Sequence, residues 1–155
     1  FMLKFTRNSV IAFDFKDALS FEGETGPYCQ YAVVRIRNIF RKGSVTPESV
    51  LTQFTAIDPA PYLAGDDNED IWALWLRAGR RTEILEQCIA TSEPAYLAKH
   101  AFQLAQEFNN FYHKHHILTE EDPARKTFLL ATAAVVLREL VAVLGWLGIE
   151  SPEAM

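Results

Sequence analysis

The longest apolar stretch of the chain, residues 128–149, limits the folds that the whole sequence can adopt. A helix of this length is long enough to cross a bilayer, but Arg138 and Glu139 stand at its middle. Each charge at the centre of a membrane span costs roughly 2.5–3.5 kcal/mol. We therefore expect a helix buried in a protein core, packed against other elements of the same chain.

Proline residues mark the starts of further helices. Thr46 precedes Pro47 and Asp122 precedes Pro123, so that each pair joins a capping side chain to a first-turn proline. The sequence predicts helices over residues 27–42, 47–55, 66–77, 82–90, 94–113 and 123–144, with Gly43 as the left-handed stop of the first and Gly79 as the end of the third. Residues 56–65 are predicted to be an unusually long loop. Residues 1–7 are predicted to be the tail of a helix that begins upstream, and residues 8–20 to be irregular with one helical turn.

No segment alternates polar and apolar residues between turn signals as a strand would. Helices should therefore fill about 65–75% of the chain, against the usual third. We expect an all-α fold with one domain over residues 1–155, built as an antiparallel bundle of about five or six helices. Trp72 and Trp75 are expected in its core. Cys29 and Cys88 lack metal or redox spacing, which favours a reduced, cytosolic protein.

Charge is distributed unevenly along the sequence. The net charge of −5 argues against a nucleic-acid partner. However, residues 1–45 hold seven Lys and Arg against four acidic residues, whereas the remainder holds eight against sixteen. A cationic N-terminal third can present a basic face to phosphate while the rest of the molecule stays acidic. Solvated faces also produce such asymmetry, so charge alone does not identify a partner.

Two clusters of polar residues are candidates for metal binding, but neither is predicted to bind one. His113 and His116, with His115 between them, could share a helix face and hold a metal. A partly exposed helix end, where a protonated His suits the dipole, explains them equally simply. The acids of residues 66–70 are typical of a first helical turn. Because the common catalytic motifs are also missing from the sequence, we predict no catalytic residue and no metal ligand.

A longer motif in residues 23–36 points to a family. It reads Gly-Glu-Thr-Gly-Pro-Tyr-Cys-Gln-Tyr-Ala-Val-Val-Arg-Ile. It resembles a signature of arginyl-tRNA synthetases, in which Thr-Gly-Pro-Tyr, one variable residue and Gln-Tyr-Ala are followed by an Arg. Residues 108–112 and the ending 147–155 resemble further stretches of that family, in the same order. The resemblance implies a C-terminal, DALR-type anticodon-binding domain of the helical kind.

The resemblance also implies a function and a setting. Such a domain holds the anticodon stem-loop of arginine tRNA, while an upstream catalytic core of the same polypeptide joins arginine to the tRNA with ATP and Mg²⁺. This chain would then be a monomeric, cytoplasmic fragment that has no cofactor of its own and is inactive alone. DNA and membranes are not expected as partners. The alternatives are a helical protein-interaction module descended from such a domain and, more remotely, a metal-dependent helical enzyme that uses the histidines.

Four residues of the signature are candidates for direct contact with RNA. Tyr28 and Tyr31 could stack on unpaired bases, and Gln30 could hydrogen-bond to a base edge. Arg35 could reach a phosphate or hold a base in a fork geometry that Lys cannot reproduce. Three of them have a structural alternative: the two tyrosines could pack in the core, and Arg35 could pair with an acid of the domain.

Four further residues complete the predicted RNA-binding set. Small Ala32 would let a base or the RNA backbone approach closely. In the family this helix and the terminal Met contribute to the anticodon pocket, so Met155 carries over together with Tyr28 and Ala32. Asn109 and Tyr112 lie in the third matching stretch and would bind RNA or brace the pocket.

Overall fold

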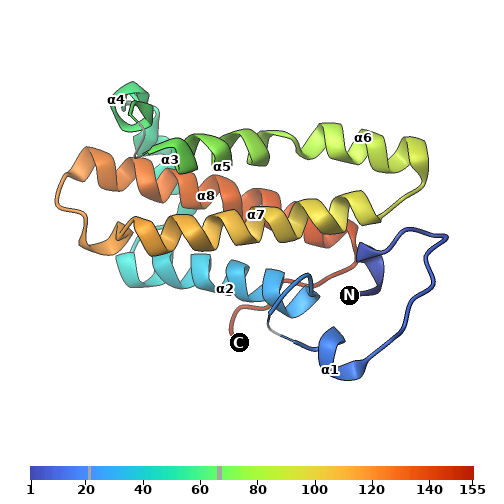
Figure 1. Ribbon diagram of the computed structural model, residues 1–155. Helices are drawn as coiled ribbons and strands as arrows, with labels where there is room; N and C mark the ends of the chain where they lie inside the picture. Colours follow the sequence, from blue (N-terminus) through green and yellow to red (C-terminus); the bar gives the residue numbers. More distant parts are fainter. Residues whose placement is uncertain (21, 66–67) are drawn as a thin grey trace.

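A computed structural model describes residues 1–20, 22–65 and 68–155, and these residues form helices and connecting segments without a β-strand (Figure 1). The longer helices are α2 (Gly26–Gly43), α3 (Pro47–Phe54), α5 (Glu69–Gly79), α6 (Arg81–Thr91), α7 (Ala95–Lys114) and α8 (Pro123–Trp146). Single helical turns are α1 (Phe15–Ala18) and α4 (Ala60–Leu63), and 3₁₀ turns lie at Met2–Lys4 and Ile117–Thr119. The predicted all-α fold is confirmed.

Helix α8 is the centre of the bundle. It contacts α2, α3, α5 and α7, and Figure 1 shows it running antiparallel to α7. It is long and apolar enough to span a membrane by length and composition, but 67% of its most apolar 18-residue window is buried inside the protein. Its charged midpoint is accommodated because the buried carboxylate of Glu139 pairs with Arg81 at 3.1 Å and with Arg138 at 2.9 Å.

The predicted capping residues start the helices. The Thr46 side chain accepts from the backbone N–H of Ser49, and the Ser49 side chain accepts from the backbone N–H of Thr46. The Asp122 carboxylate accepts from the backbone N–H of Ala124. These contacts satisfy backbone donors that have no partner within the helix. The predicted stop at Gly43 is wrong by one residue. Gly43 stays helical, and Ser44 adopts the left-handed conformation with φ of 51°.

Two details of the fold differ from the sequence-based expectation, and a third expectation concerns residues that the structure does not describe. The predicted loop of residues 56–65 contains the single turn α4. The predicted start of the third helix, residues 66–67, lies outside the described residues. Trp72 is 50% exposed and so does not belong to the core, whereas Trp75 packs against Phe128 with ring centroids 6.0 Å apart. The Trp75 indole N–H also donates to the buried hydroxyl of Thr132 at 2.9 Å.

Candidate nucleic-acid interface

An open groove of about 320 Å³ lies beside α2 and α7, next to the chain that follows α8. We call residues 147–155 the tail. The described residues that line the groove are Tyr31, Val34, Arg35, Asn38, Ile39, Lys42, Tyr112 and Met155. Four of them are predicted RNA-binding residues, and they come from three separate parts of the sequence. Folding therefore brings Tyr31, Arg35, Tyr112 and Met155 to one place.

Helical periodicity explains why α2 supplies most of the groove. Residues three or four positions apart share one face of a helix. Tyr31, Arg35, Asn38 and Lys42 follow this spacing and form a polar stripe. The neighbouring stripe of α2 is buried against α7 and α8: Cys29, Ala32, Val33, Ile36, Ile39 and Phe40. The same helix therefore anchors itself in the core and presents a polar face to solvent.

Arg35 is held in place by uncharged partners. Its Nη1 donates to Oδ1 of Asn109 at 2.7 Å, and its Nη2 lies 3.3 Å from the Tyr31 hydroxyl. The centre of its guanidinium is 4.8 Å from the Tyr31 ring centroid and 5.8 Å from that of Tyr112. Asn109 in turn donates from Nδ2 to the Tyr28 hydroxyl at 3.0 Å. Arg35 is thus fixed between two aromatic rings, and Asn109 rather than an acid is its partner across the helices.

The charged side chains of the groove are cationic. Among its described lining residues, Arg35 and Lys42 are the cations, and no aspartate or glutamate side chain is present. A hydrogen bond to an amide oxygen leaves the formal charge of Arg35 uncompensated, whereas a carboxylate would cancel it. Arg41 adds a further cation at the edge, where it donates to Oδ1 of Asn38 at 2.9 Å. A concentration of positive charge in a hollow attracts phosphate groups.

The other predicted residues lie outside the groove lining. Tyr28 is half-buried, with its ring 5.2 Å from that of Phe102, and it braces Asn109 from behind. Ala32 has no exposed surface and lies in the core, so the prediction that it borders the RNA is wrong for its side chain. The Gln30 side chain donates from Nε2 to the backbone oxygen of Glu150 at 2.7 Å. Its amide N–H is therefore engaged with the tail in this structure rather than directed into the groove.

Some groove residues were absent from the predicted set. Asn38 and Lys42 recur at the same spacing as Arg35, so the polar stripe of the helix is the signal that identifies them. Val34 and Ile39 border the groove although they are almost fully buried, and no local pattern in the sequence indicates this position. Arg37, which binds the tail, carries no local signal because its partners lie more than a hundred positions away.

The histidine cluster is divided by the fold. His115 is buried, with Nε2 2.9 Å from Oδ2 of Asp70, while His113 and His116 are exposed. Burial lowers the pKa of His115, and the hydrogen bond to Asp70 only partly opposes this effect. Burial also acts to raise the pKa of Asp70, but hydrogen bonds from Lys114 and His115 hold it below its ordinary value. Within the described ranges, no three His, Cys, Asp or Glu side chains are grouped as a metal site would require.

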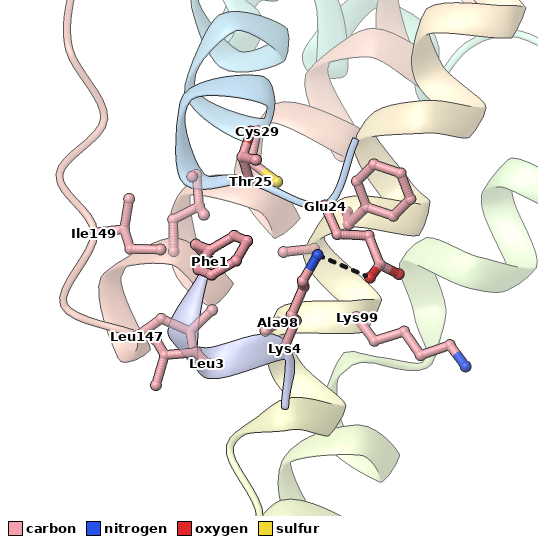
Figure 2. A pocket seen from close by; sticks show the side chains of 14 residues that line it. Phe1, Leu3, Lys4, Glu24, Thr25, Cys29, Ala98, Lys99, Leu147 and Ile149 are labelled. Carbon is pink, nitrogen blue, oxygen red and sulfur yellow. Dashed lines mark ion pairs between the residues drawn. The ribbon is translucent and has the colours of Figure 1, made fainter. Parts of the chain in front are cut away.

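A second hollow, shown in Figure 2, is too small to hold a ligand. Its volume is about 40 Å³, close to that of one or two water molecules. Phe1 and Leu3 line it from one side, and Leu147 and Ile149 line it from the tail. This hollow is a junction between the N-terminal segment and the tail, and it is much smaller than the groove.

The fold and the groove together define a class: an all-helical domain that presents a fixed arginine, two tyrosine rings and a lysine in an open hollow. Residues 29–155 match the family described as DALR anticodon binding domain. The chain belongs to this family, and the resemblance inferred from residues 23–36 is confirmed.

Similar proteins agree with this assignment. The chain is 37% identical over 155 residues to a protein of Streptococcus equi subsp. equi named arginine-tRNA ligase. It is 35% identical over 153 residues to one of the same name from Thermobifida fusca. Each match covers 99% of this chain and 25% of the relative, so the chain spans about a quarter of their length. The solved structure of Thermus thermophilus arginyl-tRNA synthetase matches with a TM-score of 0.81 and 30% identity, covering 99% of this chain and 25% of that one.

Proposed function

We propose that this chain is the anticodon-binding part of an arginine-tRNA ligase and that the groove binds the anticodon loop of arginine tRNA. One observation carries the proposal: Arg35 is fixed between Tyr31 and Tyr112, beside Lys42, with no carboxylate side chain in the described lining. Proteins recognise RNA loops by stacking unpaired bases on aromatic or guanidinium planes and by contacts to phosphate. The groove offers both kinds of contact within one hollow.

Each groove residue has a role that follows from its position. Tyr31 is 41% exposed and can stack on a base through the part of its ring that solvent reaches. The Arg35 guanidinium already donates hydrogen bonds to Asn109 and Tyr31. These bonds fix the plane of the guanidinium, and its positive charge can still act on a phosphate or a base. Met155 is 53% exposed and supplies a flexible apolar wall. Tyr28 and Asn109 act indirectly, by holding Arg35.

Aminoacylation belongs, in this proposal, to the part of the ligase that the chain does not include. ATP and Mg²⁺ would serve that catalytic core. We further propose that residues 1–155 act as one domain of a monomeric, cytoplasmic enzyme. The match to the ligases over 99% of the chain supports a domain of this extent.

Binding of RNA hairpins tests the proposal directly. The probe is a labelled anticodon stem-loop of arginine tRNA, and the control is the same hairpin with its anticodon bases exchanged. The 155-residue chain should prefer the first hairpin, with an affinity that falls as salt increases. Tyr31→Ala should weaken binding by about 1–3 kcal/mol because a stacking surface is lost, whereas Tyr31→Phe should retain most of it.

The same titrations contain the outcome that would overturn the proposal. Equal affinity for the two hairpins at every salt concentration would show that the groove does not recognise the loop. It would favour the alternative of a helical protein-interaction module. A fall in melting temperature with Tyr31→Ala and no change in affinity would instead place Tyr31 among residues that serve only the fold.

A further inference from the structure

The tail reaches the groove along α2, and we propose that Arg37 is the positioning residue that holds it there. Arg37 itself would not contact the RNA. Its role is to fix residues 151–153 against α2 so that Met155 forms a wall of the groove. The inference rests on the proposed function, because it assigns to Arg37 a part in RNA recognition.

The contacts of Arg37 are concentrated on one nitrogen. Its Nη1 donates to the backbone oxygen of Ser151 at 2.8 Å and to that of Pro152 at 2.6 Å. The same atom lies 3.3 Å from Oε1 of Glu153. A guanidinium Nη1 carries two hydrogens, so the two carbonyl groups occupy both of them. Arg37 therefore holds three consecutive residues of the tail.

Gln30 makes a second attachment to the tail. It binds the backbone oxygen of Glu150 at 2.7 Å. Gln30 and Arg37 are two helical turns apart, which corresponds to about 10 Å along the axis. Gln30 therefore holds Glu150 nearer the start of α2, and Arg37 holds the residues that follow it nearer the end of α2. The tail thus runs along α2 toward the groove.

The start of the tail is fixed in a different way from its end. Leu147 and Ile149 are partly buried against the core and border the small hollow closed by Phe1 (Figure 2). Beyond Ile149 the tail has no regular secondary structure, and residues 153–155 are exposed. Apolar packing therefore holds the first part, while the position of Met155 depends on the polar attachments at Gln30 and Arg37.

The electrostatic state of Arg37 separates it from Arg35. Its side chain is 22% exposed, and Glu153 offsets its charge. Arg35 has uncharged partners and lines the groove, but Arg37 is absent from the described lining. Arg37 is therefore poorly placed to bind phosphate, and its effect on RNA should pass through the tail.

A double-variant series tests this role. Affinity for the arginine anticodon hairpin is measured for Arg37→Ala, for a chain that ends at Ile149, and for both changes together. We expect each single change to weaken binding about five- to tenfold and the combination to be no weaker than the shortened chain alone. Arg80→Ala is the matched control, because it removes an arginine from an exposed pair with Glu83 away from the groove.

Three results would overturn the proposal. The first is an unchanged affinity for Arg37→Ala. The second is a further loss of affinity when Arg37→Ala is added to the shortened chain. The third is a salt dependence of Arg37→Ala binding that is reduced by about one ion, which would indicate a phosphate contact by Arg37 itself.

Cleavage after Glu150 by a glutamate-specific protease provides a readout without RNA. Arg37→Ala should accelerate this cleavage and Arg80→Ala should not. If cleavage accelerates but the unaltered chain does not discriminate between the hairpins, the proposed function fails while the attachment of the tail stands.

Discussion

Arg35 and Arg77 approach α7 from different helices, and their surroundings differ in one important respect. Arg35 comes from α2 and binds the Asn109 amide oxygen, with the Tyr31 hydroxyl as its second partner. Arg77 comes from α5, pairs with the Glu107 carboxylate and donates to the Gln103 amide oxygen at 2.9 Å. We call these the groove cluster (Tyr28, Tyr31, Arg35, Asn109) and the rear cluster (Arg77, His100, Gln103, Glu107).

A single carboxylate accounts for the different character of the two clusters. In the rear cluster Glu107 cancels the charge of Arg77, and the pair joins α5 to α7. In the groove cluster an amide takes the corresponding place, so Arg35 is oriented without being neutralised. An arginine between helices therefore indicates an anion-binding site only when its partners are uncharged. We expect variants of the rear cluster to change stability and variants of the groove cluster to change RNA affinity.

The largest expected effect comes from removing Arg77. Arg77→Ala leaves the Glu107 carboxylate without its partner, and one of the Glu107 oxygens is buried with no hydrogen bond. Loss of one member of a fully buried pair costs about 3–5 kcal/mol, and the partial exposure of this pair reduces our expectation to about 2–3 kcal/mol. Urea unfolding measures the loss. Hairpin affinity should not change in the fraction that remains folded, and a parallel fall in affinity would contradict the separation of the two clusters.

A smaller effect is expected from acid, because of His100. Burial, aided by Arg77 and Arg80, lowers the pKa of His100 to about 4 from an ordinary 6.5. Its stabilising contribution is complete above pH 6.5 and declines as the pH falls toward 4, since the unfolded chain takes up a proton that the folded chain does not. We expect a loss of about 2 kcal/mol in unfolding free energy between pH 7.5 and pH 5.

His100→Leu is the control for this pH dependence. It also removes a buried Nε2 that has no hydrogen-bond partner, so it should not destabilise the protein at neutral pH through lost bonding. In His100→Leu, the slope of the unfolding free energy against pH should become shallower. The pH dependence that remains should come from groups such as His115, whose pKa is also lowered. An unchanged slope would show that His100 is not the group responsible.

The smallest expected effect is also the most direct test of the comparison. Asn109→Asp preserves the shape of the side chain but places a carboxylate beside Arg35, as in the rear cluster. Hairpin affinity should fall about tenfold, with a weaker dependence on salt, because Arg35 is then neutralised. Stability should change by no more than about 1 kcal/mol. Glu107→Gln makes the reverse exchange in the rear cluster and should leave hairpin affinity unaltered.

Local signals in the sequence were sufficient to predict most of the helices. Thr46 and Asp122 cap helices through donors two or three residues away, so the information lies within a short segment. Local periodicity was less decisive within α2. Tyr31 and Ala32 are neighbours about 100° apart on the helix, yet Tyr31 is 41% exposed and Ala32 is fully buried. Only the packing against α7 and α8 determines where the edge of the core falls.

Contacts between distant segments account for what the sequence did not reveal about the site. Gln30 meets Glu150 across 120 positions, and Arg35 meets Asn109 across 74. Each residue type has several plausible partners, and nothing adjacent to it in the sequence selects one. The choice of amide over carboxylate for Arg35 becomes visible only when α2 and α7 are brought together.

The attachment of the tail to α2 also has a consequence for the order of events during folding. Gln30 and Arg37 can bind the tail only when α2 and α8 already lie side by side, because the tail continues the chain from the end of α8. The helices and their mutual packing should therefore appear first in a refolding experiment, followed by the attachment at Gln30 and Arg37. Helicity should recover before hairpin binding does. A newly refolded chain should thus pass through a period in which it is fully helical but not yet able to recognise its ligand.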